Sequence, residues 1–183
     1  MNSKHITETS KFLSFVLRHS PESIGLELDS EGWASIGDLQ NGARQQGREV
    51  DSDLLLAVVD GNEKKRFSIS DDGLRIRAVQ GHSAPTVNLQ HVEKKPPAVL
   101  YHGTATRFMK SILAQGLLPG ARHHVHLSES RETAESVGKR YGSPVILELK
   151  ADAMYSAGIK FYQADNGVWL TDAVPCEFLM EPK

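Results

Sequence analysis

Arg18 and His19 stand side by side in the chain, shortly before Pro21. A guanidinium is a permanent cation whose N–H groups match the oxygens of a phosphate, and an imidazole gains or loses a proton near neutral pH. This pair is therefore suited to binding a phosphate and to moving a proton on it. The alternative is structural, because basic side chains at the carboxyl end of a helix complement its dipole.

A second group of basic residues consists of Arg66, Arg75 and Arg77, with Lys64 and Lys65 next to them in the sequence. Apolar and polar residues alternate in this stretch, which predicts a β-hairpin with the three arginines on one face. Guanidinium groups that share a face can bind an anion through paired hydrogen bonds. The alternative is a solvated face of the hairpin that binds no ligand.

His102, Gly103 and Thr104 end an apolar stretch and precede a predicted helix. A ligand can approach the backbone of a glycine closely, so the N–H and C=O groups of Gly103 could hold a carboxamide. A buried histidine bonded to a backbone group is the alternative explanation of His102. The sequence has no glycine-rich loop of the dinucleotide-binding or P-loop type, so a nucleotide would have to be held in another way.

The segment ARHHVHLS contains three histidines, of which His124 and His126 share one face of a predicted strand. Two imidazoles rarely suffice for zinc, and no acidic residue or cysteine lies at a suitable spacing nearby. The only cysteine of the chain is Cys176. We therefore expect no metal and no internal disulfide. Arg122, beside this strand, could be a surface charge.

The first half of the chain is predicted to form three short helices followed by a hairpin, which is the pattern of a winged helix. The first helix is expected to be capped by Thr9 or Ser10 and to end before Pro21. The second and third helices are expected to begin after Ser35 and Asp51. The apolar face of the first helix is expected to consist of Phe12, Leu13, Phe15, Val16 and Leu17.

The second half combines strand-like and helix-like runs, which predicts an α+β unit. The expected helices cover residues 105–115 and 131–140, the second one opened by Ser130. The expected strands are VLYHG, HVHLS, PVILELK, GIKFYQA, NGVWLT and CEFLM. Two adjacent prolines in HVEKKPPAV deny helix on either side, so we place a domain boundary there. The predicted divisions are residues 1–90, a linker at 91–97, and residues 98–183.

Length and composition indicate a folded chain of one ordinary domain or two small ones. It has 183 residues, a formal net charge of −2, and 39% hydrophobic residues. Neither half carries the excess of positive charge that is typical of bulk nucleic-acid binding, so an RNA partner would need a local cluster. No apolar run reaches the length of a membrane span, and no secretory pattern is seen. We expect a cytoplasmic monomer without membrane contact.

Seven short motifs occur in one order along the chain: SKFLSFVLRHSPE, GWASIGDL, KKRFSIS, IRAVQGHS, LYHGT, HVHLS and NGVWL. Together they resemble the RNA 2′-phosphotransferase family, also called tRNA 2′-phosphotransferases, from about residue 10 to residue 179. The resemblance implies an N-terminal winged-helix lobe and an ADP-ribosyltransferase-like α+β lobe, joined across a central cleft. It also implies NAD as a co-substrate and, as partner, an RNA that bears a 2′-phosphate, such as a tRNA.

The reaction implied by the resemblance removes an internal 2′-phosphate from RNA in two steps. The RNA phosphate first attacks the anomeric carbon of the nicotinamide ribose and expels nicotinamide, which gives an ADP-ribosylated 2′-phospho-RNA intermediate. The neighbouring ribose hydroxyl then attacks the phosphate, releasing RNA with a free 2′-OH and ADP-ribose 1″,2″-cyclic phosphate. Both steps place negative charge on a phosphate, which fixed cations stabilise.

The resemblance also implies roles for individual residues. The catalytic set comprises Arg18, His19, Arg66 and Arg122, with His19 as general acid–base in the second step. The residues expected to bind NAD are His102, Gly103, Thr104, His126, Ser128, Thr133 and Val168. The residues expected to bind the RNA are Arg75, Arg77, Gln80, His82 and Ser83. Gly103 would hold the nicotinamide amide through its backbone.

Two other functions remain open. A nucleic-acid-binding regulator would use the third helix as a groove reader, but that segment carries Asp53, Asp60 and Glu63 and no Arg or Lys. An ADP-ribosyltransferase acting on proteins or on nucleic-acid ends would share the NAD site. Relatives of that fold that modify proteins usually carry Glu where Val168 stands, so this position and the Arg18–His19 pair weigh against it.

Overall fold

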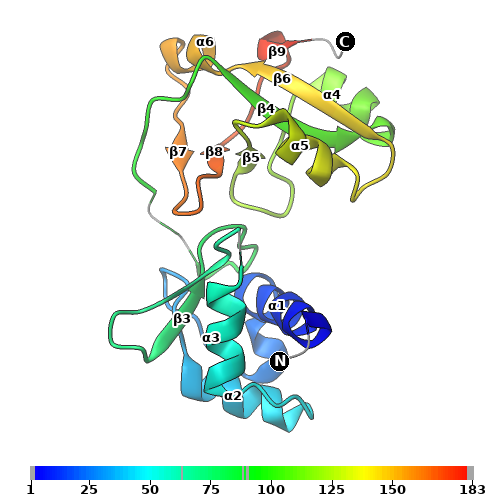
Figure 1. The fold of residues 1–183 in the computed structure, drawn as a ribbon. Coiled ribbons are helices and arrows are strands. Elements are labelled where there is room, and N and C mark those ends of the chain that lie inside the picture. Colours follow the sequence, from blue (N-terminus) through cyan, green and yellow to red (C-terminus); the bar gives the residue numbers. More distant parts are fainter. Residues whose placement is uncertain (1–2, 63, 88, 90, 181–183) are drawn as a thin grey trace. The chain divides into compact units, whose positions relative to one another are not determined.

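The structure is a computed structural model that describes residues 3–62, 64–87, 89 and 91–180. The chain divides into two compact units, Met1–Gln90 and His91–Lys183 (Figure 1). Both units combine helices with small antiparallel sheets, so the predicted α+β class is confirmed. No helix of the described part is long and apolar enough to span a membrane.

Helix α1 spans Ser3–Arg18 and ends before Pro21 as predicted, but its predicted start is wrong. Neither Thr9 nor Ser10 is a cap, because both lie inside the helix, and Thr9 is buried. The first turns of α1 are polar, so the apolar period that marks the rest of the helix does not reveal them. The predicted apolar face is also partly wrong, since Phe15 is 51% exposed.

The predicted caps of the next two helices are confirmed. The Ser35 hydroxyl accepts a hydrogen bond from the backbone N–H of Asp38 at 3.2 Å, at the start of α2 (Ile36–Gln45). The Asp51 carboxylate accepts one from the N–H of Leu54 at 2.8 Å. Each cap satisfies an N–H group that the first turn of a helix leaves without a partner. This unit also contains α3 (Ser52–Asp60), which Asp51 caps, and a short 3₁₀ helix, η1 (Pro21–Ile24).

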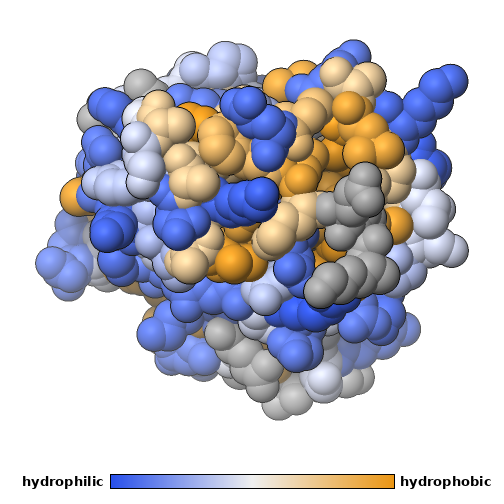
Figure 2. Space-filling model, turned by 90° about the horizontal axis from the view of Figure 1, so that it is seen from above, coloured by the Kyte–Doolittle hydropathy of each residue, from blue (hydrophilic) through white to orange (hydrophobic). Residues whose placement is uncertain are grey.

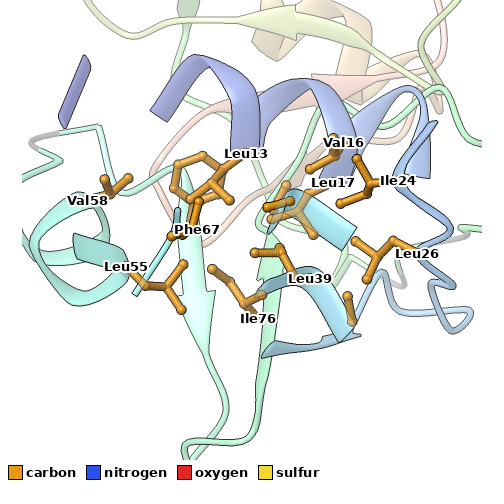
Figure 3. Close-up of a cluster of buried hydrophobic side chains, with 14 of the residues drawn as sticks. Leu13, Val16, Leu17, Ile24, Leu26, Leu39, Leu55, Val58, Phe67 and Ile76 are labelled. Atoms are coloured by element: carbon orange, nitrogen blue, oxygen red, sulfur yellow. The ribbon is translucent and has the colours of Figure 1, made fainter. Parts of the chain in front are cut away.

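The predicted hairpin is formed by β2 (Phe67–Ile69) and β3 (Arg75–Ala78). A two-residue strand that the sequence did not predict, β1 (Ala34–Ser35), pairs with the other edge of β3. The register pairs Phe67 with Ala78 and Ile69 with Ile76, which puts these apolar side chains on one face. That face packs with the helices in a buried core that includes Leu13, Val16, Leu17, Leu39, Leu55, Phe67 and Ile76 (Figure 3).

The second unit contains two three-stranded antiparallel sheets. One has the order β4-β6-β9 and the other the order β5-β8-β7. The bounds of the first are β4 (Val99–Ala105), β6 (Pro144–Lys150) and β9 (Leu179–Met180). The bounds of the second are β5 (Val125–Leu127), β7 (Tyr162–Gln163) and β8 (Trp169–Thr171). The buried core of this unit includes Leu100, Leu147, Leu149, Met154, Phe161 and Trp169.

The helices of the second unit agree in part with the sequence. Helix α5 (Arg131–Gly138) is opened by Ser130, as predicted, since the Ser130 hydroxyl accepts from the N–H of Thr133. The helix expected at 105–115 is divided into η2 (Thr106–Phe108) and α4 (Met109–Gln115). The sequence missed α6 (Ala151–Ser156), which begins directly where β6 ends.

A further prediction about this unit is wrong. The run CEFLM is not a strand throughout, because Cys176–Phe178 forms the 3₁₀ helix η3 and only Leu179–Met180 pairs with β6. In α4, Ile112 is buried whereas Leu113 is 61% exposed. The view from above in Figure 2 shows hydrophobic residues next to hydrophilic ones on the face that it presents.

Part of the segment predicted as a linker is paired with the second unit. Glu93 forms an antiparallel bridge with Tyr162 in β7, and the N–H of Lys94 donates to the carbonyl of Phe161 at 2.8 Å. The Lys94 ammonium also lies 5.5 Å from the ring centre of Trp169. Residues 93 and 94 are therefore attached to the edge of β7.

Candidate functional site

The carboxyl end of α1 is joined to a segment that lies much later in the chain. The carbonyl of Arg18 accepts hydrogen bonds from the N–H groups of Ser83 at 2.8 Å and Ala84 at 3.2 Å. Carbonyls in the last turn of a helix lack partners within the helix, and this segment supplies them. The Ser83 hydroxyl lies 2.8 Å from Nδ1 of His19. The structure thus brings together Arg18, His19 and Ser83, which the sequence singled out separately.

The two other residues predicted from the VQGHS motif lie in the same segment. His82 is only 3% exposed. Its Nε2 lies 2.9 Å from the place where a side chain on Gly32 would begin, so this glycine makes room for the imidazole. Oε1 of Gln80 is buried and has no hydrogen-bond partner in the part of the chain that is described. A buried acceptor of this kind is uncommon and often marks the place of a water molecule or a ligand.

The arginines of the hairpin lie against an aromatic ring that the sequence analysis did not single out. The guanidinium carbon of Arg77 is 4.5 Å from the ring centre of Trp33, and that of Arg75 is 5.5 Å away. Arg75 also lies 3.8 Å from a carboxylate oxygen of Asp29. These contacts fix the two guanidinium groups on the face of the sheet opposite the core. Trp33 precedes β1, and pairing of β1 with β3 brings it there.

Arg66 stands directly before β2. One of its Nη atoms donates to Oδ1 of Asn62 at 3.0 Å, and its carbonyl accepts from the N–H of Val79 at 3.0 Å. By the alternation of side chains along a strand, Arg66 points to the face opposite Phe67, which is buried. Arg66 therefore belongs to the same outer face as Arg75 and Arg77.

In the second unit, three predicted residues form a chain of hydrogen bonds. Nδ1 of His102 lies 3.0 Å from the carbonyl oxygen of His126. A carbonyl only accepts, so Nδ1 of His102 carries the proton and Nε2 is left as an acceptor. An Nη atom of Arg122 lies 3.1 Å from Nδ1 of His126. A guanidinium only donates, so His126 accepts at Nδ1 and carries its proton on Nε2.

His102 is held in its neutral form. Burial lowers the pKa of His102 below its ordinary value of 6.5, and the bond to the His126 carbonyl only partly offsets this effect. Burial has this direction for an imidazole because a charged ring loses its hydration. At neutral pH His102 is therefore an uncharged ring with a fixed tautomer.

One edge of β4 next to His102 is turned toward Ser128. Tyr101 and Ser128 exchange two backbone hydrogen bonds, at 2.8 and 2.9 Å. Successive residues of a strand turn their backbone groups to opposite edges, so the N–H and C=O of Gly103 point to the same edge as those of Tyr101. The missing side chain of Gly103 serves another purpose. A Cβ there would lie 1.7 Å from the carbonyl oxygen of Ala134, so α5 can pack on β4 only at a glycine.

Other predicted residues lie around this edge. Thr104 is buried, and Thr133 lies in the first turn of α5. The Ser128 hydroxyl donates to the carbonyl of Ser130 at 3.1 Å. Val168 lies between β7 and β8, and its carbonyl accepts from the N–H of Ala164 at 2.9 Å. Extension of the β5–β8 register by one residue places Val168 opposite Ser128.

His124 and His126 have different surroundings. The His124 ring makes edge contacts with His91 and Tyr162, and its Nε2 lies 3.7 Å from a carboxylate oxygen of Asp172. Burial is the main reason why the pKa of His124 is lowered, while the nearby carboxylate raises it. Among the residues that the structure describes, no group of three or more His, Cys, Asp or Glu side chains is placed to hold a metal ion.

Comparison with known proteins adds a family to this geometry. Residues 4–173 match the family model described as RNA 2′-phosphotransferase, Tpt1 / KptA family. A protein of Pseudomonas fluorescens, named "Probable RNA 2′-phosphotransferase", is 60% identical over 98% of both chains. A protein of Pseudomonas aeruginosa with the same name is 60% identical over 99% of this chain and all of its own length. One of Pectobacterium atrosepticum, again with that name, is 54% identical over 98% of this chain and 99% of its own. The chain belongs to the RNA 2′-phosphotransferase family.

Proposed function

We propose that this chain removes an internal 2′-phosphate from RNA by transferring it to NAD. The products are RNA with a 2′-OH, nicotinamide and ADP-ribose 1″,2″-cyclic phosphate. Membership of the family supports phosphate transfer from RNA. The observation that carries the proposal is the junction at the end of α1, where a fixed cation, Arg18, adjoins an imidazole, His19, that is bonded through Nδ1.

We assign the RNA phosphate to the first unit, as its winged-helix lobe. Three helices followed by a hairpin support that name for residues 1–90. Arg18 and Arg66 bind and neutralise phosphate oxygens, and the outer-face arginines Arg75 and Arg77 bind neighbouring parts of the RNA. Their contacts with Trp33 limit their rotamers, so less side-chain entropy is lost when an anion binds. Gln80 and His82, whose Oε1 atom and side chain respectively are buried, are assigned to the same RNA site.

We assign NAD to the second unit, as its ADP-ribosyltransferase-like lobe at residues 98–183. When bound, NAD supplies an electrophilic anomeric carbon and nicotinamide as the leaving group. The donor set fits this ligand. The backbone N–H and C=O of Gly103 match the two sides of a carboxamide, and Nε2 of the neutral His102 accepts a hydrogen bond from a ribose hydroxyl. Ser128, Thr104, Thr133, His126 and Val168 complete the proposed site.

Arg122 supplies a fixed cation for the second unit. It is bonded to His126, whose carbonyl in turn holds His102, so the three side chains form one connected arrangement. A guanidinium held in this way stabilises developing negative charge without first having to reorganise. We therefore keep Arg122 in the catalytic set with Arg18, His19 and Arg66.

The two alternative functions have less support. The exposed positions of α3 include Asp53, Leu56 and Asp60, which make a poor reader of a major groove, while Glu63 lies outside the described residues. ADP-ribosyl transfer to proteins or nucleic-acid ends shares the NAD site. That activity gives no role to the Arg18–His19 junction, so we rank it second.

The proposal is tested by the dependence of nicotinamide release on the RNA. Purified protein is incubated with NAD and either a short RNA that carries one internal 2′-phosphate or the same RNA without it. We expect nicotinamide to be released in equal amount to the 2′-phosphate removed, and none with the second RNA. Equal release with both RNAs would show NAD hydrolysis or ADP-ribosyl transfer to another acceptor, and would overturn the proposal.

A further inference from the structure

We infer that Ser83 is a positioning residue that holds the imidazole of His19, and that Nε2 of His19 is the atom that exchanges a proton with the substrate. The sequence suggested a direct contact between Ser83 and the RNA. The geometry points instead to a role through His19. The inference rests on the proposed function, in which His19 is the general acid–base.

Ser83 is attached to the end of α1 at two points. Its backbone N–H donates to the carbonyl of Arg18 at 2.8 Å, and its hydroxyl lies 2.8 Å from Nδ1 of His19. The N–H of Ala84 donates to the same carbonyl at 3.2 Å. The backbone bonds hold the backbone of Ser83 next to the end of α1, from where its hydroxyl reaches the imidazole. Ser83 therefore contacts the end of α1 through both its backbone and its side chain.

His19 needs such a partner because it is exposed. An exposed imidazole rotates freely about its terminal torsion, whose energy profile is broad. A general acid–base must lie within hydrogen-bond reach of the proton that it moves, so free rotation lowers the fraction of productive orientations. A bond to Nδ1 restricts the ring, and the ring nitrogen that faces away from Ser83 is then Nε2.

A hydroxyl on Nδ1 can hold the ring of a group that acts first as base and then as acid. It accepts from Nδ1–H while Nε2 is a base, and it still accepts after Nε2 has taken the proton and the ring is an imidazolium acid. His102 donates in the same way to the carbonyl of His126, but burial keeps its ring neutral. In the second step, Nε2 of His19 takes the proton of the attacking ribose hydroxyl and gives it to the departing 2′-oxygen of the RNA. The ring need not move between these events.

Three variants test the kinetic side of this inference. Ser83→Ala removes the hydroxyl, Ser83→Thr keeps it, and Ser52→Ala is a control at an exposed serine of α3. We expect Ser83→Ala to lower kcat about tenfold, the worth of one hydrogen bond in the transition state, with KM for the RNA changed less than about twofold. Ser83→Thr should restore most of kcat. A rise in KM with unchanged kcat would show that Ser83 binds RNA, and would overturn the inference.

A measurement on the free protein separates this inference from the proposed function. Long-range ¹H–¹⁵N spectra report the tautomer of each imidazole without any substrate. We expect Ser83→Ala to change the Nδ1 and Nε2 signals of His19, while Ser52→Ala leaves them as in the parent chain. Unchanged His19 signals in Ser83→Ala, with the thermal unfolding midpoint preserved, would disprove the contact. If the contact holds but the parent chain does not turn over 2′-phosphorylated RNA, the proposed function and the catalytic role of Ser83 both fail.

Discussion

At the scale of single residues, the hydrogen-bond partners of three histidines give the three side chains different chemistry. His19 is exposed and faces the hydroxyl of Ser83. His102 donates to a backbone carbonyl and is kept neutral by burial. His126 accepts from the guanidinium of Arg122. The first is suited to moving protons, and the other two are suited to fixed hydrogen bonding of a ligand.

Replacement of Arg18 or His19 is expected to abolish turnover without unfolding the chain. We expect Arg18→Ala and His19→Ala each to lower kcat by roughly 100-fold or more, because phosphate charge stabilisation or proton transfer is lost. The control is His5→Ala, an exposed histidine near the start of the same helix. Steady-state kinetics and thermal unfolding are measured on all three variants. Normal turnover in both Arg18→Ala and His19→Ala would remove these residues from the catalytic set.

The neutral state of His102 has a consequence for the pH dependence of stability. Its pKa in the folded chain is lowered from the ordinary value of 6.5, so below pH 6.5 the unfolded chain binds more protons at this residue. The free energy of unfolding therefore falls as pH falls below that value, until the folded pKa is passed.

The variant His102→Gln tests this dependence, because glutamine keeps a donor for the His126 carbonyl but does not titrate. We expect His102→Gln to make the fall between pH 6.5 and 5 shallower in urea unfolding experiments, and exposed His5→Gln to leave it unchanged. An identical slope in His102→Gln would show that His102 is not buried as a neutral ring.

The partners of these histidines mark the limit of what the sequence predicts about the site. Arg18 and His19 are adjacent in sequence, so their pairing is visible in it. The contact of His19 with Ser83 spans a separation of 64 residues and depends on where a loop returns to α1. The contact of Trp33 with Arg75 and Arg77 is also hidden in the sequence, because only the pairing of β1 with β3 brings these residues together. No local pattern encodes such contacts.

At the scale of elements, the sequence predicts the helix caps correctly. It does not predict the polar start of α1 or the short strand β1. The caps at Ser35, Asp51 and Ser130 were found because a hydroxyl or carboxylate satisfies N–H groups within its own turn. The start of α1 was missed because its first turns are polar, although tertiary contacts bury Thr9. The two-residue strand β1 is too short for alternation to be seen.

The packing of α5 on β4 gives a prediction at this scale. Gly103→Ala would place a Cβ 1.7 Å from the backbone oxygen of Ala134, and neither backbone can yield without moving the helix or the strand. We expect a loss of about 3 kcal/mol or more in the free energy of unfolding.

A matched substitution shows whether the effect comes from this contact. A Cβ at Gly37 in α2 would meet nothing closer than the Ser35 hydroxyl at 3.7 Å. Gly37→Ala is therefore expected to be neutral or to stabilise by up to about 1 kcal/mol, because alanine is the better helix former. Urea unfolding compares the two variants. Equal stability of Gly103→Ala and the parent chain would contradict the packing described here.

At the scale of the whole molecule, charge and composition agree with a directed contact to RNA. The formal net charge is −2, so the chain lacks the broad positive surface that gives salt-sensitive, nonspecific binding. Among its basic groups, Arg18 ends α1, and Arg75 and Arg77 lie on the outer face of β3. Such an arrangement is suited to one phosphate at one nucleotide, whereas binding along an RNA backbone needs many cations.

The fate of the phosphorus atom tests the central claim most directly. An RNA whose single internal 2′-phosphate carries ³²P is incubated with the protein and NAD, and the labelled products are separated by chromatography. We predict that the label leaves the RNA and is recovered in ADP-ribose 1″,2″-cyclic phosphate. Label released as inorganic phosphate, or retained on RNA that carries ADP-ribose as the final product, would contradict the account.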